Sequence, residues 1–353
     1  MRGSSVRRWR GFFCLLFLYG SLAAAVAQED PVQAAREGLV LIPLGDSARL
    51  ELPGGQTLRL SLPERSEVSS LAAMDGGWVA AGSFPDAAGR QRLFVLTGDD
   101  KSFRSLPEPP AQKGLQRRGP VLLVDGGRLA GLAWLEGDGG RSLAVRAAAW
   151  NGRTWQAPKT VSHPGPGSQL ALTGAVLADG SWLLAWSAFD GTADEIVWSQ
   201  RTGASWLSVR RLSEPNQVPD IAPALTATAG GGALIAWSRY DGQGYQLRMA
   251  RFERGAWLDE HVAGPSGSLY PAFLGTSDRP RLLYLEAAAR SWSVLDMDIA
   301  GKVQAKAAVA SPSRSLSRPV VDSLGGFKDG NGSVRLRWLA EKQQGTAILE
   351  RVP

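Results

Sequence analysis

The sequence has 353 residues, a formal net charge of +6 and a single cysteine, Cys14, which lies near the N-terminus. A chain with one thiol cannot form an internal disulfide, so a hydrophobic core must stabilise it, and the length is ample for one. The 42 glycines, 21 prolines and 13 tryptophans, with short apolar stretches between turn residues, argue against a helical protein and predict an all-β fold.

The first 27 residues have the three parts of a secretory signal peptide. Arginines precede an apolar run over residues 12–24, and small residues at 25–27 come just before a polar segment. The run is shorter than the roughly 20 residues that a membrane-spanning helix needs, so we expect cleavage after Ala27. We therefore predict a secreted or periplasmic protein with a polar lead-in over residues 28–37.

Without this leader the chain would carry 35 basic and 33 acidic residues and would be nearly neutral. That balance does not predict binding to nucleic acid or to an anionic membrane surface. No later apolar run approaches spanning length, and no cofactor motif is found. We expect a monomer without a membrane span or a cofactor, whose partner is a glycan or an extracytoplasmic protein.

From residue 38 the chain consists of strand-like runs separated by turn residues, and a repeat begins near residue 65. The first marker of the repeat closes the second strand of each unit, at intervals of 52, 52, 51, 47 and 54 residues. The second marker opens the fourth strand, at intervals of 52, 51, 51 and 46 residues. The first markers are Gly82, Trp134, Trp186, Trp237, Tyr284 and Trp338, and the second are Phe103, Trp155, Trp206, Trp257 and Val303.

Two markers in step indicate repeated units of four short antiparallel strands. Such a unit of roughly 50 residues is typical of one blade of a β-propeller, and the markers give six blades. A large ring at the same place in each blade fills the space between sheets about 10 Å apart, so we interpret the marker tryptophans as packing residues. Only three strands remain after residue 318, so we expect one strand of residues 38–64 to close the last blade of a single domain over 38–353.

The turn before the second marker resembles the Asp-box of sialidase-type (BNR) propellers, whose pattern is Ser-x-Asp-x-Gly-x-Thr-Trp. Residues 152–155 read Gly-Arg-Thr-Trp, but Trp150 stands where the pattern has its aspartate, as does Arg201 in the next unit. The resemblance extends from about residue 65 onward and implies a six-bladed sialidase-like fold. A sialidase also needs an arginine cluster, a Tyr/Glu pair and an acid/base Asp. The family's Arg-Ile-Pro motif has no match near residues 66–74, so we predict no catalytic residue.

In a propeller the turns between second and third strands share one face with the connections between blades, and we call this the loop face. Its Asp-Gly turns are explained most simply as favourable turn chemistry. Its proline-rich connections are stiff loops on a rigid scaffold, and four of the candidates in them should lie toward the central opening. The candidate ligand-binding residues on this face are Arg118, Asp138, Asp190, Asp220, Arg239, Tyr240, Asp241, Tyr245, Tyr270 and Arg318.

Metal chemistry has weak support in the sequence. His163 and His261 lack metal-ligand spacing, and the acidic turn near Asp190 is better explained by solvation than by calcium, so no metal site is predicted. Our leading hypothesis is an exported, non-catalytic propeller that binds a glycan or a protein partner through its loop face. The alternatives are a divergent sialidase-type glycoside hydrolase and a structural component of the cell envelope.

Overall fold

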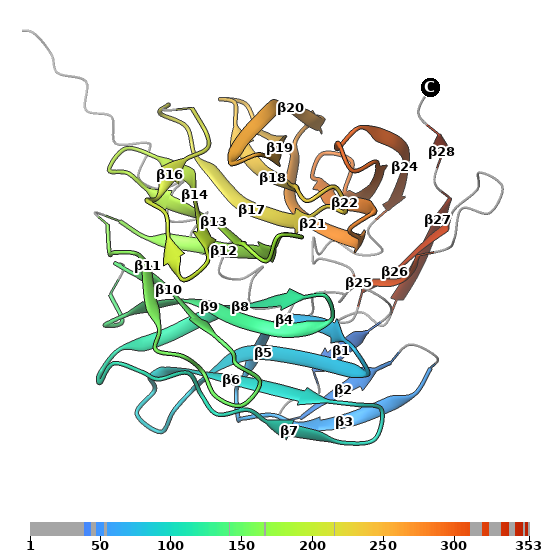
Figure 1. The fold of residues 1–353 in the computed structure, drawn as a ribbon. Coiled ribbons are helices and arrows are strands. Elements are labelled where there is room, and N and C mark those ends of the chain that lie inside the picture. The colour runs from blue at the N-terminus through green and yellow to red at the C-terminus, as the bar shows by residue number, and fades with distance from the viewer. Residues whose placement is uncertain are drawn as a thin grey trace, which may run out of the picture.

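The computed structural model describes residues 39–351, apart from 44–46, 53–54, 141, 166, 215, 311–319, 325–332, 339–342 and 349. Every regular element in this part of the chain is a β-strand, and none is a helix able to cross a membrane. The strands form seven antiparallel sheets around a common centre (Figure 1). The predicted leader and lead-in, residues 1–37, lie outside the described residues.

The strands follow one another in chain order. The N-terminal sheet contains β1 (Val40–Pro43), β2 (Ser47–Glu51) and β3 (Thr57–Ser61). Sheet I contains β4 (Glu67–Met74), β5 (Gly77–Pro85), β6 (Gln91–Gly98) and β7 (Phe103–Ser105). Sheet II contains β8 (Gln116–Asp125), β9 (Arg128–Gly137), β10 (Ala144–Ala149) and β11 (Lys159–Ser162). Sheet III contains β12 (Gln169–Val176), β13 (Trp182–Phe189), β14 (Asp194–Thr202), β15 (Ser205–Trp206) and β16 (Arg210–Arg211).

The remaining sheets continue this order. Sheet IV contains β17 (Asp220–Ala227), β18 (Ala233–Tyr240), β19 (Tyr245–Glu253) and β20 (Ala256–Ser266). Sheet V contains β21 (Ser268–Thr276), β22 (Arg279–Glu286), β23 (Ser291–Met297) and β24 (Val303–Ala310), and β28 (Glu350–Arg351) pairs with β24. Sheet VI contains β25 (Val320–Leu324), β26 (Ser333–Trp338) and β27 (Gln343–Ile348).

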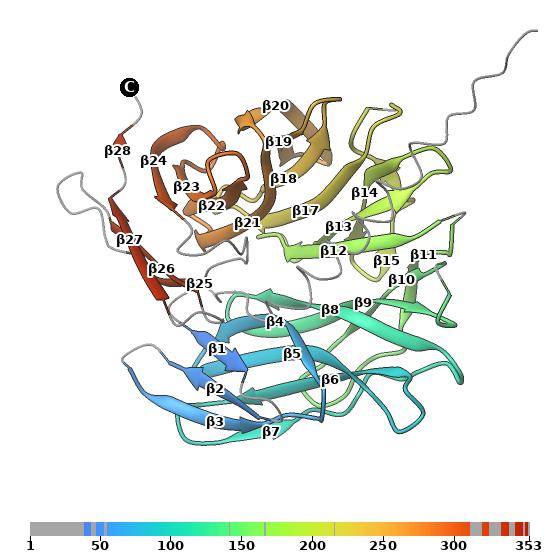
Figure 2. The same ribbon diagram turned by 180° about the vertical axis from the view of Figure 1, so that it is seen from behind.

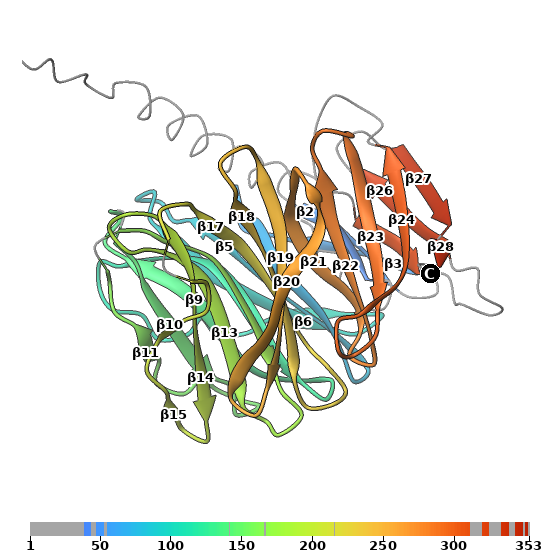
Figure 3. The ribbon, with the colours of Figure 1, turned by 90° about the horizontal axis from the view of Figure 1, so that it is seen from above.

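The predicted repeat agrees with these sheets. Each first marker lies in the second strand of its own sheet, from Gly82 in β5 to Trp338 in β26. Trp134, Trp186 and Trp237 have no exposed surface and pack in clusters that join neighbouring sheets, as expected for packing residues. The second strands are buried almost throughout because each sheet lies between two others, which Figure 3 shows in the face-to-face packing of the sheets.

The N-terminal segment differs from the expectation that it would give one strand to the last unit. β1, β2 and β3 pair with one another, and none of the described strands of sheet VI pairs with them. Leu41, Leu50 and Leu60 are buried in a cluster with Trp78 of sheet I. Covering sheet I with three apolar strands buries more apolar surface than a single edge strand would, which favours a separate sheet. Figure 2 shows this sheet between sheet I and β25–β27.

The first strands of successive sheets contact one another around the centre of the molecule (Figure 1). In sheets II to V this inner strand carries a β-bulge, and the residue at the bulge has a positive φ. The four residues are Gly119 (58°), Ala171 (50°), Ala222 (53°) and Tyr270 (57°). The bulge of sheet V is held by a serine of sheet IV, since Ser238 Oγ accepts the backbone N–H of Tyr270 at 3.1 Å.

Candidate functional site

Asp220, a predicted loop-face residue, is buried and fully engaged. Its carboxylate accepts hydrogen bonds from Trp237 Nε1 (2.8 Å), from Arg239 Nε and Nη2 (2.7 and 3.1 Å) and from Asn216 Nδ2 (3.2 Å). Arg239 also pairs with Glu260 at 3.2 Å. A buried carboxylate with four donors is satisfied by the protein itself, so Asp220 and Arg239 fasten the connection before β17 to sheet IV.

Asp190 holds its own turn together. Its Oδ1 accepts the backbone N–H groups of Thr192 (2.8 Å) and Ala193 (3.2 Å), and its Oδ2 pairs with Arg211 at 2.8 Å. These backbone hydrogen bonds keep the pKa of Asp190 below its usual value, because they stabilise the charged form. Asp194, at the end of the same turn, is affected in the opposite direction: burial, with the nearby charges of Asp190 and Glu195, raises its pKa to about 6.

Other loop-face candidates also serve local structure. Asp138 accepts the N–H of Gly140 at 2.9 Å, and Asp241 accepts those of Gln243 and Gly244, each at 2.9 Å. The rings of Tyr240 and Tyr245 meet edge to face at 5.6 Å. The structural interpretation of the Asp-Gly turns therefore has direct support in the hydrogen bonds, while ligand binding by these side chains stays a prediction.

The remaining candidates are Arg118, Tyr270 and Arg318. Arg118 is exposed, whereas its neighbour Arg117 is buried and pairs with Glu108. Tyr270 is half-buried at its bulge, and Arg318 lies outside the described residues. None of the nine described candidates lines the pocket that the structure shows elsewhere.

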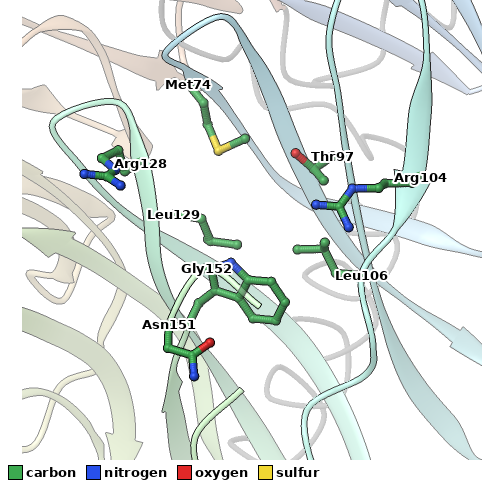
Figure 4. Close-up of a pocket in the computed structure, with 9 residues that line it drawn as sticks. Met74, Thr97, Arg104, Leu106, Arg128, Leu129, Asn151 and Gly152 are labelled. Atoms are coloured by element: carbon green, nitrogen blue, oxygen red, sulfur yellow. The ribbon is translucent and has the colours of Figure 1, made fainter. Parts of the chain in front are cut away.

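That pocket, of about 440 Å³, lies between sheets I and II. It is built from the turns between first and second strands and between third and fourth strands, so it opens on the face opposite the loop face, which we call the box face. Its lining residues, drawn in Figure 4, are Met74, Thr97, Arg104, Leu106, Arg128, Leu129, Trp150, Asn151 and Gly152.

One wall of the pocket is the half-buried ring of Trp150, which directly follows β10. This ring packs against the buried ring of Trp155, with centroids 4.8 Å apart. Trp155 is itself fixed, because its Nε1 donates to the carbonyl of Pro107 at 2.6 Å. The aromatic wall is thus supported from behind and is rigid before any ligand arrives.

The turn that carries this wall is closed by Asn151. Its Oδ1 accepts the backbone N–H groups of Arg153 (2.9 Å) and Thr154 (2.7 Å). In sheet I the equivalent residue Asp99 accepts the N–H groups of Lys101 and Ser102 in the same way. The side chain that accepts these hydrogen bonds, Asn151 or Asp99, therefore lies one residue after the position that the Asp-box pattern gives to its aspartate. The sequence comparison examined only the aspartate position and so did not find it.

The rim of the pocket joins two hairpin turns. The backbone N–H of Asp75, between β4 and β5, donates to the carbonyl of Gly127, between β8 and β9, at 2.8 Å. Gly127 has a φ of 77°, and a Cβ there would lie 2.1 Å from Asp75 Oδ1. Only glycine fits this approach, which fixes the separation of sheets I and II at the rim.

Two arginines stand on opposite sides of the pocket, Arg104 in β7 and Arg128 at the start of β9 (Figure 4). Both are exposed, and among the described residues neither has a recorded ion pair or side-chain hydrogen bond. Asp125 faces Arg128 across the β8–β9 turn in register, without an ion pair between them. The nine lining residues include no aspartate, glutamate or histidine. The pocket therefore combines an aromatic wall with positive charge.

Strand register explains why space is left here. In sheet III, Trp182 pairs with Val176, and its ring reaches sheet II so closely that it would come within 2.3 Å of a Cβ on Gly131. In sheet II the same register position, paired with Val124, holds Leu129, because the strand pair has a bulge between Leu123 and Val124. Because the side chain of Leu129 is smaller than that of Trp182, it leaves unfilled space between sheets I and II. The sequence has Trp78 and Trp182 four residues before the first marker of their units but Ala130, Ala233 and Pro280 in three others, so this position alone does not single out sheet II.

In the described part of the chain, no group of three or more His, Cys, Asp or Glu side chains is arranged to hold a metal ion. The lining of the box-face pocket has an aromatic ring, an amide, a hydroxyl and two guanidinium groups, which suit it to binding by stacking, hydrogen bonds and charge.

No protein-family model matches the chain, and no curated protein matches it. The BP39L lectin from Burkholderia pseudomallei is 14% identical and has a TM-score of 0.61, covering 91% of this chain and 96% of that one. The polysaccharide lyase Uly1 is 10% identical with a TM-score of 0.53, covering 92% of this chain and 91% of that one. A protein of unknown function from Dyadobacter fermentans is 13% identical with a TM-score of 0.51, covering 91% of this chain and 97% of that one. At these identities the likeness is one of fold, which is that of a β-propeller; a specific sialidase-type relationship stays a prediction.

Proposed function

We propose that the protein is an exported β-propeller that binds a carbohydrate without cleaving it, and that the pocket between sheets I and II is its binding site. The observation that carries the proposal is the half-buried ring of Trp150, held by Trp155 in the wall of a pocket of about 440 Å³. A concave site with an aromatic wall and a few polar groups is the usual form of a small-ligand site, and a sugar ring presents an apolar face to such a wall.

The solved structures of similar fold favour a carbohydrate over a protein partner, since they include a lectin and polysaccharide lyases. Binding without cleavage is favoured by the composition of the pocket wall. Hydrolysis of a glycosidic bond usually needs a pair of carboxyl groups, and the nine lining residues supply none. Cleavage by elimination needs a side chain that acts as a base, and the lining residues include no histidine, tyrosine or lysine.

The proposal includes two further features from the sequence. Export rests on the leader over residues 1–27. We propose that the six repeat units, sheets I to VI, are six blades, and that the N-terminal sheet, which packs on sheet I, closes the ring between the first and last of them. Tyr240 and Tyr245 make the loop face the second candidate surface for the same ligand.

The proposal is tested by titration calorimetry of residues 28–353 against a panel of neutral and acidic oligosaccharides. We expect at least one to bind, and we expect Trp150→Ala to weaken it by roughly 5-fold or more, since stacking of one ring is worth about 1 kcal/mol or more. Tyr240→Ala, a half-buried aromatic on the loop face, is the matched control and should leave affinity unchanged. Binding that Tyr240→Ala removes and Trp150→Ala spares would place the site on the loop face. Shortened oligosaccharides after incubation would show an enzyme.

A further inference from the structure

We infer that the pocket between sheets I and II selects a saccharide that carries an oxyanion, a carboxylate or a sulfate ester, and that Arg104 and Arg128 recognise this group. The inference rests on the proposed function, because it names the class of carbohydrate that the same pocket takes.

The first argument is the pairing of arginines across the molecule. Elsewhere in the described chain, many buried and half-buried arginines are paired with carboxylates, as in the pairs Arg92–Glu108, Arg117–Glu108, Arg146–Glu136, Arg239–Asp220 and Arg281–Asp296. The half-buried Arg201 instead lies over the ring of Trp182. Arg104 and Arg128 line a pocket and have no such recorded partner among the described residues. A guanidinium in this situation has its donors available for a carboxylate or sulfate, which it binds with two parallel hydrogen bonds.

The second argument is the surroundings of the two charges. Met74, Leu106 and Leu129 give the pocket an apolar lining, which strengthens electrostatic attraction once a ligand displaces water. No lining residue is acidic, and the nearby carboxylates of Asp75 and Asp125 belong to the two turns at the rim. Both arginine side chains are exposed, and their attraction for a ligand should therefore weaken as salt is added.

The two arginines should not contribute equally. Asp125 lies opposite Arg128 across the β8–β9 turn and reduces the positive potential there. Arg104 has no acidic residue paired with it in register, since its partner in β6 is Thr97. Figure 4 shows the guanidinium of Arg104 directed toward the middle of the pocket. We therefore assign the larger share of oxyanion recognition to Arg104, with the sugar ring resting on Trp150.

The test compares one oligosaccharide with and without its charge, and adds a sulfated oligosaccharide of a different sugar backbone. Titration calorimetry of residues 28–353 uses an α-1,4-linked galacturonate tetramer, the same tetramer as its full methyl ester, and a κ-carrageenan tetrasaccharide whose only anions are sulfate esters. We expect the galacturonate or the sulfated tetramer to bind at least about 10-fold more tightly than the methyl ester. Whichever of the two charged ligands binds more tightly identifies the recognised anion as carboxylate or sulfate. Raising NaCl from 50 to 300 mM should reduce this preference.

The variants separate recognition from overall charge. Arg104→Gln should remove most of the preference for the charged ligand, and Arg128→Gln should remove less. Arg153→Gln is the control, since Arg153 is an exposed arginine of the same turn as Trp150 and does not itself line the pocket. An equal effect of Arg153→Gln and Arg104→Gln would mean that net charge alone attracts the ligand, and the inference would be overturned.

The outcomes also distinguish this inference from the proposal beneath it. Equal binding of the charged tetramer and its methyl ester, both weakened by Trp150→Ala, would overturn oxyanion selection and leave carbohydrate binding in place. Failure of every oligosaccharide, charged and neutral, to bind would overturn both.

Discussion

The space between sheets I and II is open at the box face, whereas the same space between sheets II and III is filled. Between sheets II and III, the ring of Trp182 is only 4% exposed, and the guanidinium of Arg201 lies 4.1 Å above it. Between sheets I and II, Leu129 takes the register position of Trp182, and Trp150 takes that of Arg201. The large aromatic ring belongs to the second strand in sheet III (Trp182) but to the turn after the third strand in sheet II (Trp150), where it borders the pocket.

The interface between sheets III and IV has its aromatic ring on the third strand, and there the ring is buried. Between sheets III and IV, Ala233 pairs with Phe252, and the ring of Phe252 is 2% exposed against Trp198 and Trp257 at 5.4 and 5.1 Å. The fold thus tolerates an aromatic residue on the turn-side strand and still closes the gap. The opening at Trp150 is a local departure from a closed repeat, and such departures are where functional sites are expected.

The largest expected effect comes from emptying the filled interface. Trp182→Ala should reduce the free energy of unfolding by about 3–5 kcal/mol, because it removes a buried ring and leaves a cavity. Leu129→Ala, at the same register position in sheet II, should cost less, about 1–2 kcal/mol, since Leu129 already borders open space. Urea unfolding measures both. Equal losses would mean that the two interfaces are packed alike.

Filling the open space between sheets I and II should change stability less but should strongly weaken ligand binding. Leu129→Trp places in sheet II the side chain that closes the gap in sheet III. We expect ligand affinity to fall by at least about 10-fold, while the change in the free energy of unfolding stays within about 1–2 kcal/mol because space is present. Undiminished binding by a folded Leu129→Trp protein would show that the pocket is not the site.

The stability of the fold should depend on pH through the loop-face end of sheet III, whereas binding in the pocket between sheets I and II should not depend on pH. The pKa of Asp194 is about 6 in the fold, above its ordinary value of 3.8, so the folded protein favours the neutral carboxyl. The cost of ionising it is absent below the unfolded pKa, grows as pH rises toward 6 and is then constant. Asp194→Asn removes this cost and should raise Tm by roughly 1–3 °C at pH 8, and by less at pH 4.5.

The pocket itself should show little pH dependence over the same range. Its only charged lining residues are Arg104 and Arg128, and guanidinium groups stay protonated between pH 5 and 8. We therefore expect the affinity for a methyl-esterified or a sulfated oligosaccharide to be constant between these pH values in calorimetric titrations. A bell-shaped or sigmoidal change would indicate that a titrating side chain outside the lining set takes part in binding.

Much of the repeat could be predicted from the sequence because spacing records it. Trp134, Trp186 and Trp237 recur at nearly constant intervals, and a ring at a fixed place in each sheet requires the same neighbours each time. The separate N-terminal sheet could not be predicted in this way, because residues 38–64 contain no marker. Their pairing is decided by tertiary burial against sheet I, of which a single sequence carries no local signal.

The pocket was harder to predict because it results from the absence of a large side chain at the position of Leu129. A bulge near Leu123 shifts β9 by one residue and brings Leu129, in place of Ala130, to face sheet I. The shift depends on hydrogen-bond register, which residue spacing does not show. Trp150 was seen in the sequence only as a failed match to an aspartate. Asp220 and Arg239 were predicted as binding residues because they are polar and lie in loop segments, but the structure pairs them with each other.

The central claim is that Trp150 and the open space before it hold a carbohydrate, and a crystal structure of residues 28–353 with a bound acidic oligosaccharide tests it most directly. We predict an ordered sugar ring against the indole of Trp150, with its oxyanion beside Arg104. An ordered sugar against Tyr240 and Tyr245 on the loop face, with the pocket between sheets I and II free of ligand, would contradict it.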